Sequence, residues 1–257
     1  MMPRVGNRTA VLVLALLAVL LAAFFLIWGP IAQPEGYHQF ADRRPWLRVP
    51  NALDVLSNLP FLLVGAAGLW LLVAPAALPR EAFGHGFERG AFAVVFAALV
   101  LVAFGSAYYH WQPTTERLFW DRLPIAIALT ALLGIVIAER IDLDAGRRLF
   151  WPLALTGIGS TLVWRLTADL RLYLFVQVFT LLALPLLLLL RPPRYTRTGD
   201  LVWMMVLYGA AKICEAGDVA VFSVLGVVSG HTLKHLLAGV ALAQLLRHLR
   251  RRRLASA

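Results

Sequence analysis

Runs of about 20 apolar residues follow one another along almost the whole chain of 257 residues. A helix of that length spans the roughly 30 Å hydrocarbon layer of a membrane. Apolar residues make up 60% of the chain and charged residues only 15%, which excludes an ordinary soluble enzyme. We therefore expect an all-α, polytopic membrane protein with a single membrane domain.

Eight segments meet this length requirement and are predicted to be helices. They are residues 10–29, 52–74, 90–111, 121–138, 149–166, 171–190, 200–222 and 230–247. The first is longer than the apolar stretch of a signal peptide, about 7 to 15 residues, so we interpret it as a helix. The chain then divides into residues 1–29 with an N-terminal stub and the first helix, an outer loop over 30–51, a seven-helix core over 52–247, and a basic tail over 248–257.

The distribution of positive charge predicts the orientation of these helices. The chain has 24 lysines and arginines and a net charge of +10. The loops on the side of both termini carry 15 of the basic residues and those on the other side carry 7, which predicts cytoplasmic termini. The many arginines and the basic tail suit lipid headgroups, so we expect membrane contacts and no nucleic-acid partner. The preference for arginine and alanine over lysine indicates a GC-rich bacterial genome and thus the bacterial inner membrane.

Five polar residues inside or beside the predicted helices are the candidate site, because polar groups in a membrane are costly and mark function. Ser106 and His110 are four residues apart in FGSAYYHW and share a helix face. Asp121 stands at the start of the next helix, and His231 and His235 are again four apart in GHTLKHLLAG. The predicted orientation places all five in the outer third of the membrane.

These residue types point to metal-assisted hydrolysis. Three neutral imidazoles around Zn²⁺ leave a fourth position for water, whose pKa the metal lowers to about 7. Asp121 is then a candidate general base and acid, and Ser106 a candidate partner of the substrate carbonyl or its oxyanion. Each residue also has a structural interpretation: the histidine pair can be structural, Ser106 can bond to its own helix backbone, and Asp121 can favour a helix start.

The same spacing resembles a known family. The pattern S-x3-H, an aspartate eleven residues on, and a late H-x3-H in the final helix resembles the alkaline ceramidase family, within a superfamily of seven-helix membrane hydrolases that includes adiponectin-receptor-like proteins. The stretch PNALDVLSNLPFL, residues 50–62, is similar to the opening of the first core helix in the ceramidase branch. The resemblance covers residues 40–247 and makes the first helix an addition to a seven-helix core.

The resemblance implies an activity and a role for each site residue. Zinc would be bound by His110, His231 and His235, with Asp121 handling protons and Ser106 assisting at the carbonyl. The reaction would be hydrolysis of the amide that joins a fatty acid to a sphingoid base in ceramide or a similar sphingolipid. Two other classes stay open on the residues alone: a non-enzymatic seven-helix receptor or sensor, and a haem- or metal-handling membrane protein that uses the same histidines.

One departure from the family concerns calcium. Animal members carry several carboxylates before the first core helix, whereas residues 35–51 offer only Glu35 and Asp42 beside three arginines. Because Ca²⁺ prefers six to eight oxygen ligands, we do not expect calcium regulation through Asp42. We expect Asp42 to pair with a nearby arginine instead.

The remaining charged residues of the last two helices receive secondary interpretations. Lys212 and Glu215 are expected to form a neutralising pair. Alternatively, Glu215 or Asp218 orients a zinc-bound histidine through its second ring nitrogen. Lys234 is expected on a different helix face from the histidines, without a role. The other histidines, in loops or the tail, are expected in solvent: His38, His85 and His248.

Overall fold

The computed structural model describes residues 5–74 and 77–255, and within them the chain is all-helical, without a β-strand. The all-α prediction is confirmed. The helices are α1 Asn7–Trp28, α2 Ala52–Leu56, α3 Leu59–Val73, α4 Gly86–Trp111, α5 Thr115–Arg140, α6 Leu143–Thr167, α7 Arg171–Leu190, α8 Thr198–Ala216, α9 Asp218–Leu225 and α10 Gly230–Arg251, with short 3₁₀ turns η1 at Glu35–His38 and η3 at Arg80–Ala82.

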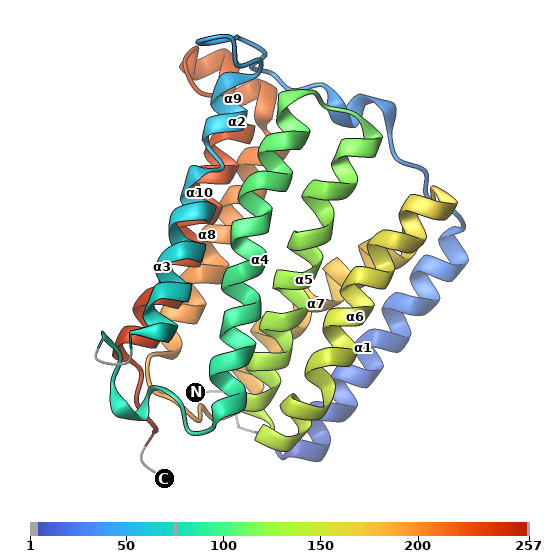
Figure 1. Cartoon of the computed structure of the whole chain (residues 1–257). Coiled ribbons are helices and arrows are strands. Elements are labelled where there is room, and N and C mark those ends of the chain that lie inside the picture. The colour runs from blue at the N-terminus through green and yellow to red at the C-terminus, as the bar shows by residue number, and fades with distance from the viewer. Residues whose placement is uncertain (1–4, 75–76, 256–257) are drawn as a thin grey trace.

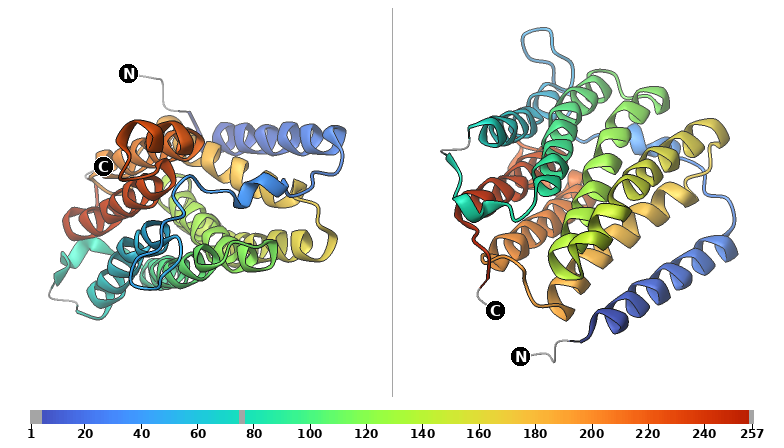
Figure 2. Two further views of the ribbon diagram at one scale, coloured as in Figure 1. Left: turned by 90° about the horizontal axis from the view of Figure 1, so that it is seen from above. Right: turned by 60° about the horizontal axis from the view of Figure 1, so that its bottom comes forward.

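The long helices stand side by side as an antiparallel bundle (Figures 1 and 2). α4 packs between α3 and α5, α5 also contacts α6 and α7, and α10 packs against α3 and α8. α5 is largely buried at the centre, whereas α1 is almost wholly exposed and lies along α7 at one edge. The start of α1 and the end of α10 lie at the same end of the bundle, opposite the loop 30–51 (Figure 1).

Several helices are long and apolar enough to cross a membrane, as a membrane protein requires. In the described part of the chain these are α1, the α2–α3 segment, α4, α5 and α7, and a sixth is added if α9 and α10, bent by 103°, count as one span. The predicted spans 149–166 and 200–222, now α6 and α8, fall short of the same measure. For α8 the reason is its charge content: Asp200, Lys212 and Glu215 all lie within it.

Two of the predicted helices are broken where the sequence suggested continuity. The segment 52–74 breaks after Leu56, because Pro60 has no N–H to continue the hydrogen-bond ladder. In the gap, Ser57 Oγ and Asn58 Nδ2 donate to the Asp54 carbonyl at 3.1 and 2.8 Å. The segment 200–222 is divided at Gly217 into α8 and α9. Both breaks lie at the end of the bundle that carries the loop 30–51.

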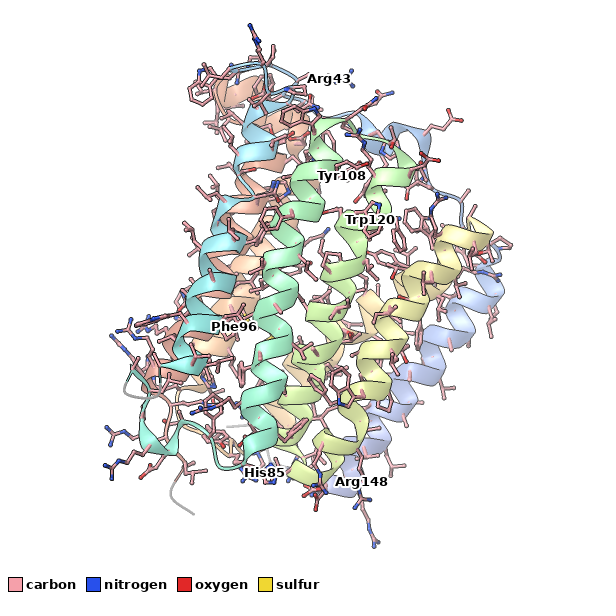
Figure 3. The ribbon with its side chains drawn as sticks, viewed as in Figure 1. Arg43, His85, Phe96, Tyr108, Trp120 and Arg148 are labelled. Atoms are coloured by element: carbon pink, nitrogen blue, oxygen red, sulfur yellow. The ribbon has the colours of Figure 1, made fainter. Side chains whose placement is uncertain are left out.

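The two ends of the bundle differ in character. The main apolar core, which includes the fully buried Phe96, fills the end near the chain termini (Figure 3). Part of the basic tail packs into this end: His248 and Arg252 are buried, and Arg252 pairs with Glu139. The expectation that His248 lies in solvent is therefore wrong. At the opposite end, exposed aromatic side chains such as Tyr108 and Trp120 are of the kind enriched at membrane interfaces (Figure 3).

Candidate metal centre

The three histidines predicted as ligands meet at the loop end of the bundle. His110 comes from the last turn of α4, and His231 and His235 from the first two turns of α10. Their ring centroids are 4.7 to 4.9 Å apart, and one ligand nitrogen from each lies within 4.8 Å of the others. All three are at most 5% exposed. Together they can hold a metal ion.

The spacing of the nitrogens fits such an ion. His110 Nε2 and His231 Nε2 are 3.2 Å apart. Two nitrogens bound to a tetrahedral Zn²⁺ at 2.0–2.1 Å are about 3.3–3.4 Å apart, so this pair is already close to the bound geometry. Within the described residues, no fourth histidine, cysteine or carboxylate joins the cluster. Three protein ligands leave one tetrahedral position open, as in catalytic zinc sites.

The break between α2 and α3 supplies a partner for one of these rings. Ser57 Oγ lies 2.8 Å from His235 Nδ1, in a part of the site that is fully buried. A hydrogen bond at Nδ1 fixes the ring orientation and leaves Nε2 for a metal. Ser57 has this position because the helix stops at Leu56 and restarts at Leu59. The sequence drew attention to Ser57 through the family resemblance but indicated no role for it.

Ser106 and Asp121 are brought together by a close contact between α4 and α5. The Ser106 hydroxyl lies beside the Asp121 carboxylate and interacts with it. Gly105 permits this approach, since a Cβ at residue 105 would lie 2.1 Å from the Trp120 carbonyl oxygen. Asp121 and the three histidines are all buried, and each interacts electrostatically with Lys234. Of the residues singled out by spacing, the three histidines form one cluster.

Replacing Gly105 with alanine is expected to lower stability by about 1–3 kcal/mol, because the helices must separate to admit the methyl group. The matched control is Gly90→Ala on the same helix, where a Cβ meets nothing within 4 Å and alanine is the better helix former. Thermal unfolding of both purified variants checks this. Equal melting temperatures for the two variants would contradict the role assigned to Gly105.

Lys234 lies beside the histidines, which corrects the expectation that it faces elsewhere. Its Nζ is 3.1 Å from His231 Nε2 and donates to Glu215 Oε1 at 2.9 Å. Its position in the sequence puts Lys234 on a different helix face, but its long side chain extends across the helix surface to His231. The predicted Lys212–Glu215 pair is present, so Glu215 bridges two lysines. In the structure Glu215 approaches the cluster through Lys234 rather than through an imidazole.

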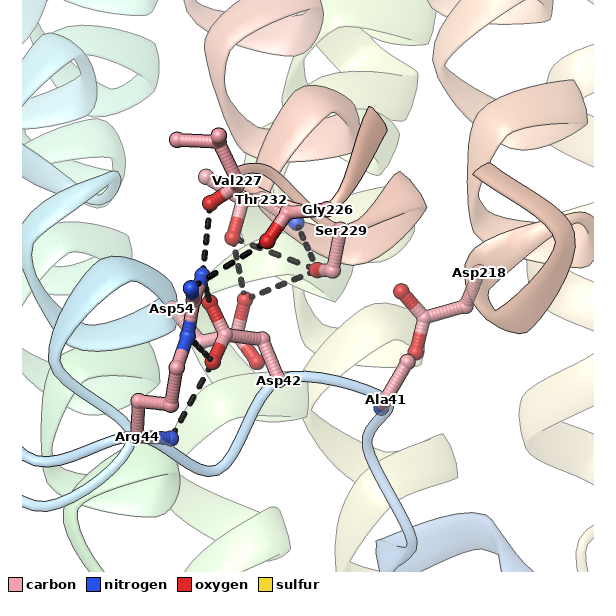
Figure 4. A network of polar contacts seen from close by, with 9 residues as sticks. All are labelled: Ala41, Asp42, Arg44, Asp54, Asp218, Gly226, Val227, Ser229 and Thr232. Carbon is pink, nitrogen blue, oxygen red and sulfur yellow. Dashed lines mark hydrogen bonds and ion pairs between the residues drawn. The ribbon is translucent and has the colours of Figure 1, made fainter. Parts of the chain in front are cut away.

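Asp218 supports the backbone at the start of α10. Its Oδ1 accepts a hydrogen bond from the His231 backbone N–H at 2.7 Å, and its Oδ2 accepts one from the Ala41 N–H at 2.9 Å. The carboxylate therefore links the loop 30–51 to His231, the first candidate metal ligand of α10. Figure 4 shows Asp218 beside Ala41 of this loop. Asp218 contacts backbone N–H groups and not an imidazole ring, in contrast to the alternative expected from the sequence.

The loop 30–51 covers the cluster and is held by ion pairing. The Phe40 ring lies 4.7 and 4.4 Å from the rings of His110 and His231. Asp42 pairs with Arg44, as predicted, and both of its carboxylate oxygens accept from the guanidinium at 2.8 Å. Arg44 also donates to the carbonyls of Gly226 and Val227 after α9 (Figure 4).

A buried aspartate of α2 also joins the two halves of the site. Asp54 is fully buried and accepts from Thr232 Oγ1 at 2.6 Å and from Ser229 Oγ at 3.4 Å (Figure 4). The Asn51 side chain, just before α2, donates to the His110 carbonyl at 2.8 Å. Both contacts tie the start of the α2–α3 segment to the helices that carry the histidines.

The Asp42–Arg44 pair predicts how the loop responds to acid. The Arg44 guanidinium holds the pKa of the Asp42 carboxyl below its usual value. The ionised Asp42 carboxylate stabilises the folded loop fully at pH values above the pKa of an aspartate in the unfolded chain, about 3.9. This stabilisation is lost as the pH falls through the lower pKa that Asp42 has in the folded chain. Asp42→Asn is expected to remove it at neutral pH too, with exchange of the Arg44 amide hydrogen at least about tenfold faster. Hydrogen exchange checks this against Asp144→Asn in an exposed pair with Arg147; equal exchange in both variants would contradict it.

Neither a protein-family model nor a curated protein matches this chain.

Proposed function

We propose that the chain is an integral membrane, zinc-dependent amidohydrolase that cleaves the N-acyl amide of ceramide or a similar sphingolipid to a fatty acid and a sphingoid base. One observation carries the proposal: three imidazoles able to hold a metal lie in the same buried region as a carboxylate and its hydroxyl partner, Asp121 and Ser106. A metal carrier or a structural histidine cluster requires neither of these two residues.

The chemistry follows from the donor set. Zn²⁺ suits three imidazoles, and when bound there it supplies a water of lowered pKa and polarises the substrate carbonyl. Asp121 accepts the proton of the attacking water and later delivers it to the leaving nitrogen. Ser106 donates a hydrogen bond to the carbonyl oxygen as negative charge develops on it. Phe40 and the loop 30–51 exclude bulk water from the histidines.

The proposal extends to the architecture. The α2–α3 segment through α10 forms a seven-helix hydrolase core, and α1 is an addition to it. The edge position of α1 along α7 supports this division. Both termini face the cytoplasm of a bacterial inner membrane, as the loop charges predict, and the site then faces outward. A site near the outer face of the membrane is within reach of an amide bond next to a lipid headgroup.

Hydrolysis of ceramide by the purified protein tests the activity. The detergent-solubilised wild type is incubated with a ceramide that carries a fluorescent acyl chain, and free fatty acid is measured. Release is expected in the presence of zinc, loss after chelation, and recovery when zinc is added back. Release that continues at the same rate in the chelator would contradict the metal mechanism, and absence of release under all conditions would contradict ceramide hydrolysis.

A further inference from the structure

Arg122 is a buried cation next to the proposed proton-handling residue. It follows Asp121 on α5 and is 6% exposed. Its guanidinium is surrounded by three aromatic rings, with centroid distances of 4.3 Å to Trp164 on α6, 4.9 Å to Tyr173 on α7 and 5.2 Å to Tyr37 in η1. The rings hold the guanidinium in place through cation–π contacts.

No anion compensates this charge directly. Within the described residues Arg122 makes no hydrogen bond and no ion pair, and its Nη1 is sealed from solvent without a partner. Asp121 acts on it electrostatically, but the two residues form no ion pair. Arg252, at the other end of the bundle, shows the usual arrangement: it is equally enclosed by aromatic rings but pairs with Glu139.

A buried guanidinium without an anionic partner is energetically unfavourable. Cation–π attraction is weaker than the cost of removing an ion from water, so a buried arginine normally has an anionic partner. Ionisable groups within membrane helices that lack one are candidate binding sites. The planar guanidinium matches carboxylate and phosphate groups, which it binds through two parallel hydrogen bonds.

The position of Arg122 indicates which part of a substrate carries the anion. Tyr37, from the loop 30–51, covers the guanidinium, and burial together with the Arg122 charge lowers the pKa of the neighbouring His38. Arg122 therefore lies at the loop end of the bundle, which the proposed membrane orientation places at the level of the lipid headgroups. It also adjoins Asp121, which in the proposed reaction protonates the leaving amine.

We propose that Arg122 binds a carboxylate or phosphate on the amine side of an N-acyl lipid substrate. The assignment to a substrate rests on the proposed hydrolase function and shifts its preferred substrate from ceramide, whose head is neutral, to an N-acyl lipid with an anionic head. The Trp164, Tyr173 and Tyr37 rings set the plane of the guanidinium, so that two of its N–H groups meet the two oxygens of the anion.

A matched pair of ligands tests this on the full-length protein in detergent. N-palmitoylglycine and N-palmitoylethanolamine differ only in a carboxylate against a hydroxymethyl group, and phosphorylated N-palmitoylethanolamine supplies the phosphate arm. Dissociation constants are measured by thermophoresis, and palmitate release is measured by mass spectrometry in the same samples. The wild type is expected to bind at least one of the two anionic lipids at least tenfold more tightly than the neutral one. The anion that gains more identifies the head.

Three variants test whether Arg122 causes the preference for the anionic lipids. Arg122→Gln is expected to lose it while keeping its affinity for N-palmitoylethanolamine, and Arg122→Lys is expected to retain part of it because the charge remains. Arg117→Gln is the control. Like Arg122, Arg117 stacks on an aromatic ring, but this ring is that of Tyr108 on α4, outside the site. Equal affinity for all three ligands in the wild type, or a preference that survives in Arg122→Gln, would overturn the proposal.

The two readouts separate this proposal from the proposed function. An Arg122-dependent preference without palmitate release from any ligand supports the anion site and counts against the hydrolase. Palmitate release with no preference for anions supports the hydrolase and overturns the anion site. The wild-type comparison does not depend on the folding of any variant.

Discussion

Replacement of Asp121 with asparagine is expected to lower the rate of amide hydrolysis by about a thousandfold and to leave the metal content unchanged. Asparagine has nearly the same shape, but it neither accepts the proton of the attacking water nor delivers one to the leaving nitrogen. General acid–base catalysis contributes about 10²–10⁴ in rate, and here one residue serves both steps. The metal stays because Asp121 is not among the three ligands.

Metal content and turnover, measured on the same preparation, check this prediction. Asp144→Asn is the matched control, because Asp144 is an exposed carboxylate on α6. Ser106→Ala is expected to cost less, about ten- to a hundredfold, since one hydrogen bond to the developing oxyanion is lost. An Asp121→Asn variant with wild-type turnover would remove Asp121 from the mechanism.

Replacement of His110 with alanine is expected to remove both the metal and the activity. His110 is the ligand that α4 contributes, while the other two stand on α10, so its loss leaves two imidazoles on one helix. Two neutral ligands do not complete a catalytic zinc site, and the metal content should fall from about one to below about a tenth per chain. Elemental analysis of the purified variant measures this.

Two further variants serve as comparisons for the metal content and activity of His110→Ala. His248→Ala also removes a buried imidazole of α10, but at the far end of the bundle beside Glu139, and should retain metal and activity. Ser57→Ala removes the hydrogen bond at His235 Nδ1 and should weaken metal affinity about 10- to 100-fold. Full metal content in His110→Ala would show that the histidine cluster is not the metal site.

Helical periodicity accounts for what the sequence predicted of the site. Spacing by four places Ser106 with His110 and His231 with His235, and α4 and α10 are continuous helices over these residues. The meeting of α4, α5 and α10 at one end followed from the alternating direction of the segments. Apolar length alone identified the bundle, although α6 and α8 do not meet the same measure of hydropathy.

Contacts made by long or irregular parts of the chain were not predictable in this way. Lys234 is on another face by helix position, but its four-carbon side chain brings Nζ to His231. Ser57 reaches His235 only because the helix breaks before Pro60. A search for long runs of apolar residues does not reveal that break. Phe40 lies in a loop without periodicity, two residues before the ion-paired Asp42, so helical spacing gave no information on its position over the histidines.

X-ray absorption at the zinc edge of the purified wild-type protein tests the central claim most directly. The account predicts about one zinc per chain, bound by three imidazole nitrogens and one oxygen at about 2.0–2.1 Å, with this signature lost in His110→Ala. Absence of zinc, a sulfur ligand at about 2.3 Å from Cys214, or the same spectrum in His110→Ala would contradict it.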